Sequence, residues 1–520
     1  MPRLLSALIG LLAVAALATP AQAAPTAGAT PLSPELEAIR AAEAVALYGS
    51  PEIRPMDQRK TGIATMGDSE ISGEGEGPYE TGTNGDDDGD GDQNWCHRSY
   101  AAGIHRTGIA VDKTYNLACS GAVTQNLIAG NGVRQWDELN QGDNLAIKAR
   151  NTRIKLVWIV ASANDGGGLE FGPVITDCTI KRIFFQGECW PAYTDQVQAR
   201  VTVSGANLRT AVTSVKQTMV DAGYAAGDYQ LVVMSYPSPV SPDVEDTPNF
   251  PGWYGGGCTM YLRDMAIGRN KVVPLFERAV RAAAEGAGAR YLDASRLFHG
   301  HETCTGQPWT RGVVSSWGDA FDPNTYRQSW HPNAGGHGAF GSCVKSFYDN
   351  PSWSSATCTS TDSAVRVRQG LLDFTQLRNT ASTLCVDAQG HSTRNGYALI
   401  QWGCHGARNQ GWWYDSTTSS LHIELTHDRC ADVATGVGVG RPLIVWDCHG
   451  GWNQKFLLDG TLIRAVVDPG LCVAVPDTAW GRQLSMAPCD GSDPRQQWAG
   501  QPKTGTAGYG YNDWMPSSAY

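Results

Sequence analysis

A threefold internal repeat between residues 372 and 499 is the feature that most constrains how this chain can fold. The repeat units begin at Cys385, Cys430 and Cys472, so they are spaced 45 and 42 residues apart. In each unit a second cysteine follows the first, 19, 18 and 17 residues later. Such a period indicates stacked units that share one core. The cysteine spacing predicts that each unit closes its own disulfide loop.

Short signatures recur at matching places in the three units. The first unit reads LCVD at 384–387, QWGC at 401–404 and NQGW at 409–412. The second reads RCAD at 429–432, VWDC at 445–448 and NQKF at 453–456, and the third ends in RQQW at 495–498. Spacing, cysteines and the Gln-x-aromatic signature together resemble the ricin B-type β-trefoil lectins. This resemblance covers about a quarter of the chain.

The resemblance implies two sugar pockets. A carboxylate and an amide can hold two sugar hydroxyls while the sugar ring stacks on an aromatic face. The third unit has Ala474 and Arg495 where the acid and the amide belong, so it is expected to be structural; the alternative is a trefoil that binds no sugar at all. The glutamine and the final aromatic of each signature favour the core, because they recur even where the pocket is lost. The implied sugar-binding residues are Asp387, Trp402, Asn409 and Gln410 in the first unit, and Asp432, Trp446, Asn453 and Gln454 in the second.

Residues 58 to 348 alternate between apolar strand-like runs and helix-like stretches. The runs lie at 62–66, 154–161, 231–235 and 290–292, and the clearest helical stretches lie at 207–222 and 263–287. Alternating strands and helices predict a parallel sheet with helices on both faces. The expected fold class is therefore multidomain, with a three-layer α/β domain followed by an all-β β-trefoil.

This α/β region contains four short polar blocks. The first strand runs directly into Gly67-Asp68-Ser69, which places a serine at the carboxyl end of a parallel strand, where such sheets present ligand-facing groups. Further blocks occur at 116–122, at 162–167 and at 329–337. In this order they resemble the Ser, Gly, Asn and His blocks of the SGNH (GDSL-like) hydrolases, and the segment 94–99 also resembles secreted bacterial members of that family.

The resemblance assigns chemical roles to one residue of each block. Ser69 would be the nucleophile and His331 its base, because a neutral serine hydroxyl needs a base to attack an ester. The backbone N–H groups of Ser69 and Gly121 and the side chain of Asn164 would hold the oxyanion. His337 lies outside the matched base position and is expected to be structural. This chemistry needs no cofactor and no metal.

Two positions depart from the family pattern. Ser162 stands where a glycine usually lies two residues before the Asn, which is a mild change. Gln328 stands three residues before His331, where the family usually has an Asp that orients the imidazole. A backbone carbonyl at or beside Gln328 can accept the same hydrogen bond, which would give a Ser–His dyad. The alternative is that Asp322 reaches the imidazole across a loop.

The N-terminus has the pattern of an export signal. Arg3 precedes an apolar run at 4–18 that is too short to span a bilayer, and small residues follow at 21–23. Export to an oxidising compartment agrees with 14 cysteines, of which eight precede residue 359 and six follow residue 384. A secreted, extracellular protein is therefore expected. The predicted segments are an export signal at 1–24, a lead-in or pro-segment at 25–57, a hydrolase domain at 58–358, a linker at 359–371, the lectin domain at 372–499 and a flexible tail at 500–520.

Charge and hydropathy restrict the partners. A net charge of −11 argues against nucleic acid, which needs a basic face, and no segment after the export signal is apolar enough to cross a membrane. The acidic run at 86–91 resembles the front of a calcium loop, but the twelfth position is His97, where an EF-hand needs a Glu. A solvated loop is the favoured interpretation.

These observations favour a carboxyl ester hydrolase that a lectin directs to glycans. Tethering raises the local concentration of substrate, so acetyl esters of polysaccharides are the expected target. Two alternatives stay open: a lipase or phospholipase of the same fold, and a glycan-binding protein whose hydrolase domain has decayed.

Overall fold

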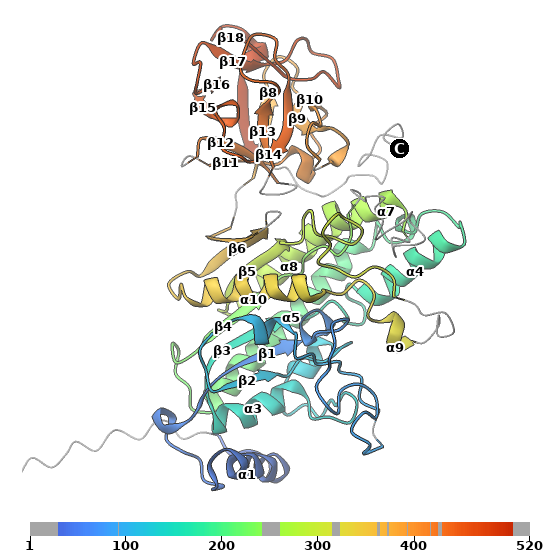
Figure 1. Cartoon of the computed structure of the whole chain (residues 1–520), viewed down its shortest axis with the longest axis vertical. Coiled ribbons are helices and arrows are strands. Elements are labelled where there is room, and N and C mark those ends of the chain that lie inside the picture. Colours follow the sequence, from blue (N-terminus) through green and yellow to red (C-terminus); the bar gives the residue numbers. More distant parts are fainter. Residues whose placement is uncertain are drawn as a thin grey trace, which may run out of the picture.

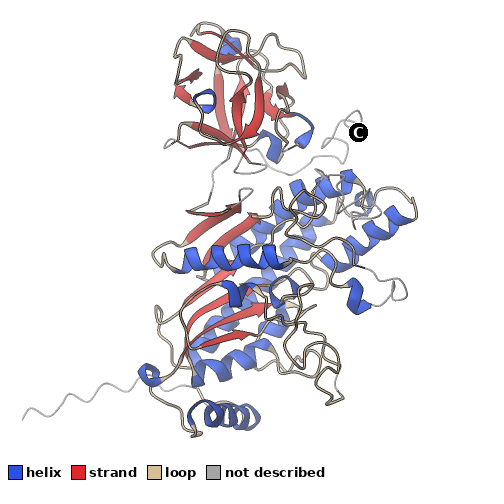
Figure 2. Ribbon diagram, viewed as in Figure 1, coloured by secondary structure: helices blue, strands red, loops and turns tan. Residues whose placement is uncertain are grey.

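The computed structural model describes residues 30–502, apart from 92, 242–259, 315–322, 361–363, 372–373, 393, 416–417 and 425–428. The predicted export signal, most of the predicted tail, and Asp319 and Asp322 lie outside the described residues. Two bodies follow one another along the chain, an α/β domain and an all-β domain (Figures 1 and 2). Both halves of the predicted fold class are confirmed.

The first domain is built on a seven-stranded sheet with strand order β2-β1-β3-β4-β5-β6-β7. Every neighbouring pair is parallel except β6 and β7. The four predicted strand runs coincide with β1, β3, β4 and β5. The strands are β1 (Thr61–Gly67), β2 (Lys113–Asn116), β3 (Arg153–Val160), β4 (Gln230–Met234), β5 (Arg290–Arg296), β6 (Ser355–Ser360) and β7 (Val365–Gln369).

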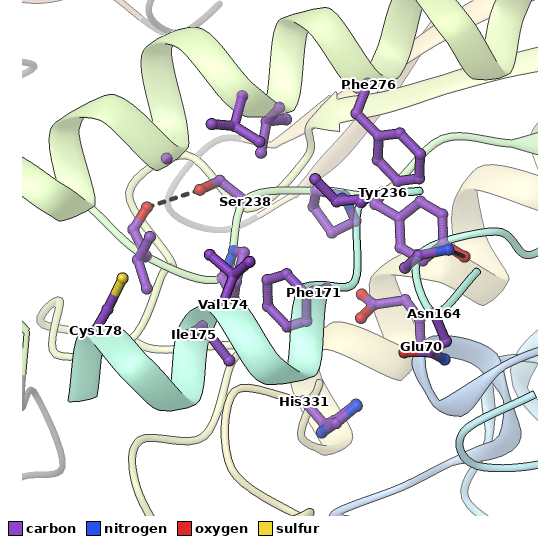
Figure 3. A pocket seen from close by; sticks show the side chains of 18 of the residues that line it. Glu70, Asn164, Phe171, Val174, Ile175, Cys178, Tyr236, Ser238, Phe276 and His331 are labelled. Atoms are coloured by element: carbon purple, nitrogen blue, oxygen red, sulfur yellow. Dashed lines mark hydrogen bonds between the residues drawn. The ribbon is translucent and has the colours of Figure 1, made fainter. Parts of the chain in front are cut away.

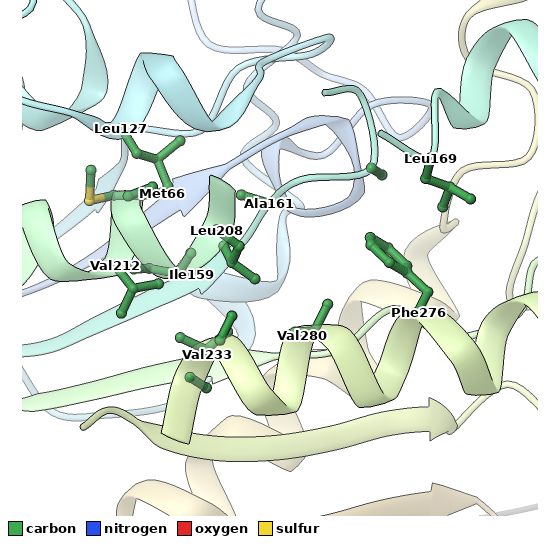
Figure 4. Packing of buried hydrophobic residues seen from close by; sticks show 14 of the residues in the cluster. Met66, Leu127, Ile159, Ala161, Leu169, Leu208, Val212, Val233, Phe276 and Val280 are labelled. Atoms are coloured by element: carbon green, nitrogen blue, oxygen red, sulfur yellow. The ribbon is translucent and has the colours of Figure 1, made fainter. Parts of the chain in front are cut away.

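Successive side chains of β3 point to opposite faces of the sheet and are buried on both. Val157 and Ile159 join one core cluster, whereas Leu156 and Trp158 join a second. The first cluster packs under α3, α5 and α8 and the second under α10, so helices cover both faces; Figure 4 shows part of the first cluster. The helices are α1 (Pro34–Tyr48), α2 (Ser69–Ser72), α3 (Gln141–Asn151), α4 (Phe171–Ile183), α5 (Val197–Asp221), α7 (Leu262–Ile267), α8 (Val273–Gly286), α9 (Pro323–Tyr326) and α10 (Ala334–Tyr348).

The predicted lead-in contains α1, which packs on the α/β domain. Its N-terminus is capped by the Ser33 side chain, and Gly49 ends it in a left-handed conformation (φ 72°). Arg40 donates to Asn151 at 3.1 Å, and Glu43 pairs with Lys148 at 2.7 Å, so both bonds fix α1 to α3. No helix in the described part of the chain is both long and apolar enough to cross a bilayer.

The predicted linker contains a strand. β7 (Val365–Gln369) pairs antiparallel with β6 and forms the edge of the first sheet. Its valines alternate with arginines, a half-buried strand pattern that the Ser- and Thr-rich composition of its surroundings conceals. The segment joining the domains is therefore shorter than predicted, and Arg368 of this strand pairs with Asp415 of the second domain at 3.3 Å.

The second domain contains one four-strand unit per sequence repeat, as β8–β11, β12–β15 and β16–β19. The disulfides Cys385–Cys404, Cys430–Cys448 and Cys472–Cys489 each close a loop within one unit, as predicted. All three units contribute to one shared apolar core. The strands are β8 (Thr375–Asn379), β9 (Cys385–Ala388), β10 (Leu399–Trp402), β11 (Trp412–Asp415), β12 (Ser420–Ile423), β13 (Arg429–Val433), β14 (Leu443–Asp447), β15 (Phe456–Asp459), β16 (Leu462–Ala465), β17 (Leu471–Ala474), β18 (Ser485–Pro488) and β19 (Trp498–Pro502).

Candidate active site

The turn that carries Ser69 is held tightly between β1 and β3. Gly67 has φ 147°, and a Cβ there would lie 1.8 Å from the Val160 carbonyl oxygen, so only glycine fits. The Gln141 side-chain amide bonds both the N–H and the C=O of Gly67, at 2.7 and 2.8 Å. Asp68 caps α2 by accepting from the Glu70 N–H at 3.1 Å. Ser69 therefore begins α2 at the carboxyl edge of the sheet.

His331 lies in the loop before α10, and a backbone carbonyl orients its ring. Its Nδ1 lies 2.8 Å from the carbonyl oxygen of Ser329. A carbonyl only accepts, so Nδ1 carries the hydrogen and Nε2 of the neutral ring is free to take a proton. The main chain of His331 is itself held, since the Arg311 N–H donates to its carbonyl at 2.9 Å. Burial lowers the pKa of His331, against the charge of Glu74, which raises it.

A hydrogen bond links Asn164, one of the predicted oxyanion residues, to the loop that contains the other, Gly121. The Asn164 side-chain amide donates to the carbonyl of Ala122 at 3.2 Å, which ties it to the loop that contains Gly121. Gly121 has φ 79° and is exposed, and the Cys96–Cys119 disulfide anchors the chain just before it. The Cys119 N–H also donates to the Gly67 carbonyl at 3.1 Å. The Gly, Asn and Ser blocks thus meet at one edge of the sheet.

Ser69, Asn164 and His331 line a single cavity, which extends away from them between α4 and α8. No hydrogen bond joins Ser69 and His331 within the described residues; such bonds often form only when substrate is bound. In Figure 3, Glu70 and Asn164 lie towards one end and Cys178 at the other. The cavity wall beyond the polar end is largely apolar, and its main contributors are Phe171, Val174, Ile175, Trp190, Val240, Met260, Val272 and Phe276.

The sequence did not indicate the role of the acidic side chains beside Ser69, the predicted nucleophile. Burial raises the pKa of Asp68 to about 7, although its hydrogen bond from the Tyr236 hydroxyl lowers it. Burial and the charge of Asp68 raise the pKa of Glu70 well above its ordinary value of 4.5. Glu70 directly follows Ser69 and lines the cavity, so its position could have been noticed, but its partial burial depends on tertiary packing.

The sequence model of the GDSL-like lipases and acylhydrolases matches residues 63–344, which is more than half of the chain. The chain belongs to the GDSL-like lipase/acylhydrolase family. Residues 373–499 match the ricin-type β-trefoil lectin domain. The GDSL-like domain makes the protein an ester-bond hydrolase, and the lectin domain implies that it binds carbohydrate.

The GDSL-like domain is similar to Streptomyces proteins. A lipase of Streptomyces rimosus is 27% identical over 312 residues, which cover 59% of this chain and 94% of the lipase. The crystal structure of an extracellular lipase of the same organism matches with 23% identity and a TM-score of 0.35, covering 55% of this chain and 98% of the other. The C-terminal half of an earthworm R-type lectin matches the lectin domain with 16% identity and a TM-score of 0.22, covering 25% of this chain and 98% of the other.

The two predicted sugar pockets of the lectin domain have the same internal geometry. Asn409 donates to Asp387 at 2.9 Å, and Asn453 donates to Asp432 at 2.9 Å. Trp446 is exposed at the second site. At the first site Trp402 is half-buried and meets the ring of Trp480 edge-on, with ring centroids 5.1 Å apart. Trp480 belongs to the third unit, so this contact was not predicted.

Two details of these pockets differ from the predicted residue set. Gln410 and Gln454 are fully buried and donate to Asp387 and Asp432 at 2.8 and 2.9 Å, so they hold the carboxylates and are not exposed in the pockets. A histidine that follows the second cysteine in units one and two also faces the carboxylate. The Nε2 atoms of His405 and His449 lie 3.2 and 3.3 Å from Asp387 and Asp432. The repeated Cys-His pair is visible in the sequence and could have indicated these histidines.

The acidic run forms an exposed loop. The carboxylates of Asp86, Asp88 and Asp90 lie within 4.8 Å of one another and are exposed. His97, at the twelfth position of the calcium-loop pattern, is instead buried against Glu74. The loop therefore lacks the last ligand that an EF-hand requires.

Proposed function

We propose that the protein is a secreted lipase-type carboxyl ester hydrolase that prefers esters with an extended acyl chain and is directed to glycan-bearing surfaces by its lectin domain. The observation that carries the acyl preference is the apolar cavity that opens at Ser69 and His331 and continues along α4. From Phe171 to Cys178, α4 advances by seven residue steps, which corresponds to about 10 Å of helix.

In the proposed reaction, the Ser69 hydroxyl oxygen attacks the ester carbonyl carbon and its proton passes to Nε2 of His331. The backbone N–H groups of Ser69 and Gly121 and the Asn164 amide stabilise the oxyanion. The tetrahedral intermediate then expels the alcohol, which takes the proton from Nε2, and leaves an acyl-enzyme at Ser69. Water activated by the same imidazole hydrolyses it and releases the carboxylic acid.

The apolar cavity favours substrates with longer acyl chains, because each methylene group that is buried in it is stabilised by about 0.8 kcal/mol. An acetyl group would leave most of this cavity unfilled. The lectin domain is the feature that favours the second candidate, an esterase for acetyl groups on polysaccharides, since tethering raises the local concentration of such esters.

A series of p-nitrophenyl esters from acetate through butyrate and octanoate to laurate tests the proposal. The expected result is that kcat/KM rises from acetate to the longer esters, and that Ser69→Ala lowers every rate by about a thousandfold or more. A maximum at acetate would favour the acetyl esterase. Equal turnover by the wild type and Ser69→Ala would favour a lectin with a decayed hydrolase domain.

Binding to insoluble xylan and galactan tests the targeting role separately. The double variant Asp387→Ala, Asp432→Ala is expected to lose retention on whichever polysaccharide retains the wild type, while hydrolysis of soluble esters stays unchanged. Asp459→Ala, a change of an exposed carboxylate in the same domain, is the matched control.

A further inference from the structure

A buried pair of ionisable groups, Glu74 and His97, lies near the proposed base, His331. The side chains are 0% and 1% exposed, and Nδ1 of His97 lies 2.9 and 2.8 Å from the two carboxylate oxygens of Glu74. Nε2 of His97 faces the Asn84 side-chain oxygen at 3.1 Å. A carboxylate only accepts, so Nδ1 of His97 carries a hydrogen and donates it to Glu74.

Several contacts lock this pair in place. The Tyr79 ring stacks on His97 with centroids 4.3 Å apart, and the Tyr79 hydroxyl accepts from the Gly75 N–H at 3.1 Å. His97 itself has φ 46°, a left-handed conformation that costs free energy in a residue other than glycine. Taking the carboxylate of Glu74 out of water is also costly. A buried pair with this cost, held by this many contacts, suggests a role beyond packing.

The pair lies against the segment that orients His331. Glu74 belongs to the turn after α2, and a Cβ on its neighbour Gly75 would lie 3.1 Å from the carbonyl oxygen of Gln328. The next carbonyl along the chain, that of Ser329, holds Nδ1 of His331. Gln328 is also the position at which the acid expected three residues before the base is missing.

We infer that Glu74 is a positioning residue whose buried carboxylate, fixed by His97, supplies the negative charge beside His331 that the missing acid would otherwise provide. This inference rests on the proposed roles of Ser69 and His331. The charge of Glu74 stabilises the imidazolium that forms when Ser69 attacks, so the carbonyl of Ser329 sets the tautomer and Glu74 supplies the electrostatic support.

The mutual electrostatics agree with this assignment. Although burial raises it, the pKa of Glu74 is lowered overall, first by His97 and then by His331 and Ser120. Conversely, Glu74 raises the pKa of His331 more than His97 lowers it. Among the described residues, the other titratable or charged groups that lie near His331 or line its cavity are Arg311, His337, Asp68, Glu70, Tyr236 and Asp264.

The test is the pH profile of ester hydrolysis by the full chain. In Glu74→Gln the loss of the carboxylate lowers the pKa of His331, so the acid limb of kcat/KM moves to lower pH by about one unit. The plateau of kcat falls about tenfold because the imidazolium is less stabilised, and KM changes little. Glu74→Asp, which keeps the charge, returns the acid limb towards the wild-type position.

Glu76→Gln is the matched control, since Glu76 lies in the same turn and pairs with Arg311 at 3.0 Å near the surface. Its acid limb stays at the wild-type position. If Glu74→Gln leaves His97 unpaired and does not fold, the double variant Glu74→Gln, His97→Gln replaces both ionisable groups with neutral ones. Its acid limb is expected to move in the same direction but less far, because Glu74 raises the pKa of His331 more than His97 lowers it.

An acid limb at the wild-type position in either variant overturns the inference, even if kcat falls, because a purely structural defect would not move it. Absence of Ser69-dependent turnover in the wild type would instead overturn the proposed function.

Discussion

Nδ1 of His331 lies 2.8 Å from the backbone carbonyl oxygen of Ser329, so the ring has an acceptor on the side where the family usually places a carboxylate. This carbonyl belongs to the residue after Gln328 and lies within the predicted range, which was a backbone carbonyl at or beside Gln328. A carbonyl fixes the tautomer as well as a carboxylate does, but it carries no net charge. The contact supports a Ser–His dyad.

The dyad predicts that Asp322→Asn leaves hydrolysis nearly unchanged. Asp322 lies outside the described residues, and the Ser329 carbonyl already occupies the position at Nδ1 that Asp322 would need. The expected kcat/KM for p-nitrophenyl butyrate is within about threefold of the wild type, whereas His331→Ala is expected to lose about a thousandfold or more. A loss of about a thousandfold in Asp322→Asn would refute the dyad.

The apolar cavity predicts that Ile175→Trp shifts the acyl-chain preference. Ile175 is buried in the cavity wall, and an indole there would fill the space that a long chain needs. Turnover of laurate is expected to fall at least about tenfold, while that of acetate changes little. Ile180→Trp, on the exposed side of the same helix, is the control. Equal losses for both esters would show that the chain lies elsewhere.

The sequence predicted the elements that depend on local pattern and left out those that tertiary packing creates. An apolar strand followed by Gly67-Asp68-Ser69 and the spacing of the cysteines were enough to place the turn that carries Ser69 and the three lectin units. The apolar cavity could not be predicted, because its walls come from segments as distant as Phe171 and Phe276. The burial of Glu74 against His97 could not be predicted either. It follows from the path of the loop between them, whose acidic run at 86–91 has the pattern of a solvated turn.

The departure at Ser162 has a conformational consequence. Ser162 is fully buried with φ 97°, in the region that favours glycine, and its hydroxyl has no hydrogen-bond partner among the described residues. Ser162→Gly is therefore expected to raise the free energy of unfolding by about 1 kcal/mol, since relief of strain exceeds the added chain entropy. Urea denaturation measures it. Ser235→Gly should instead destabilise, because the Ser235 hydroxyl accepts from the Ala294 N–H at 2.8 Å.

Glu70 predicts a pH-dependent stability. Its pKa is raised in the folded protein, chiefly by burial, well above the ordinary value of 4.5. Between those two values the folded state holds a proton that the unfolded state has lost, so the free energy of unfolding falls as pH rises. Glu70→Gln is nearly isosteric and cannot ionise, so it removes this fall in the free energy of unfolding. Its melting temperature is expected to exceed that of the wild type by a margin that grows from about pH 4.5 upwards.

Melting curves across this pH range distinguish the effect from a general gain in packing. Glu52→Gln removes an exposed carboxylate and is expected to follow the wild type at every pH. A margin for Glu70→Gln that stayed constant with pH would mean that the side chain is ionised in the folded protein. The carboxyl beside Ser69 would then be a charge that the ester has to approach, and the apolar acyl cavity would begin beyond it.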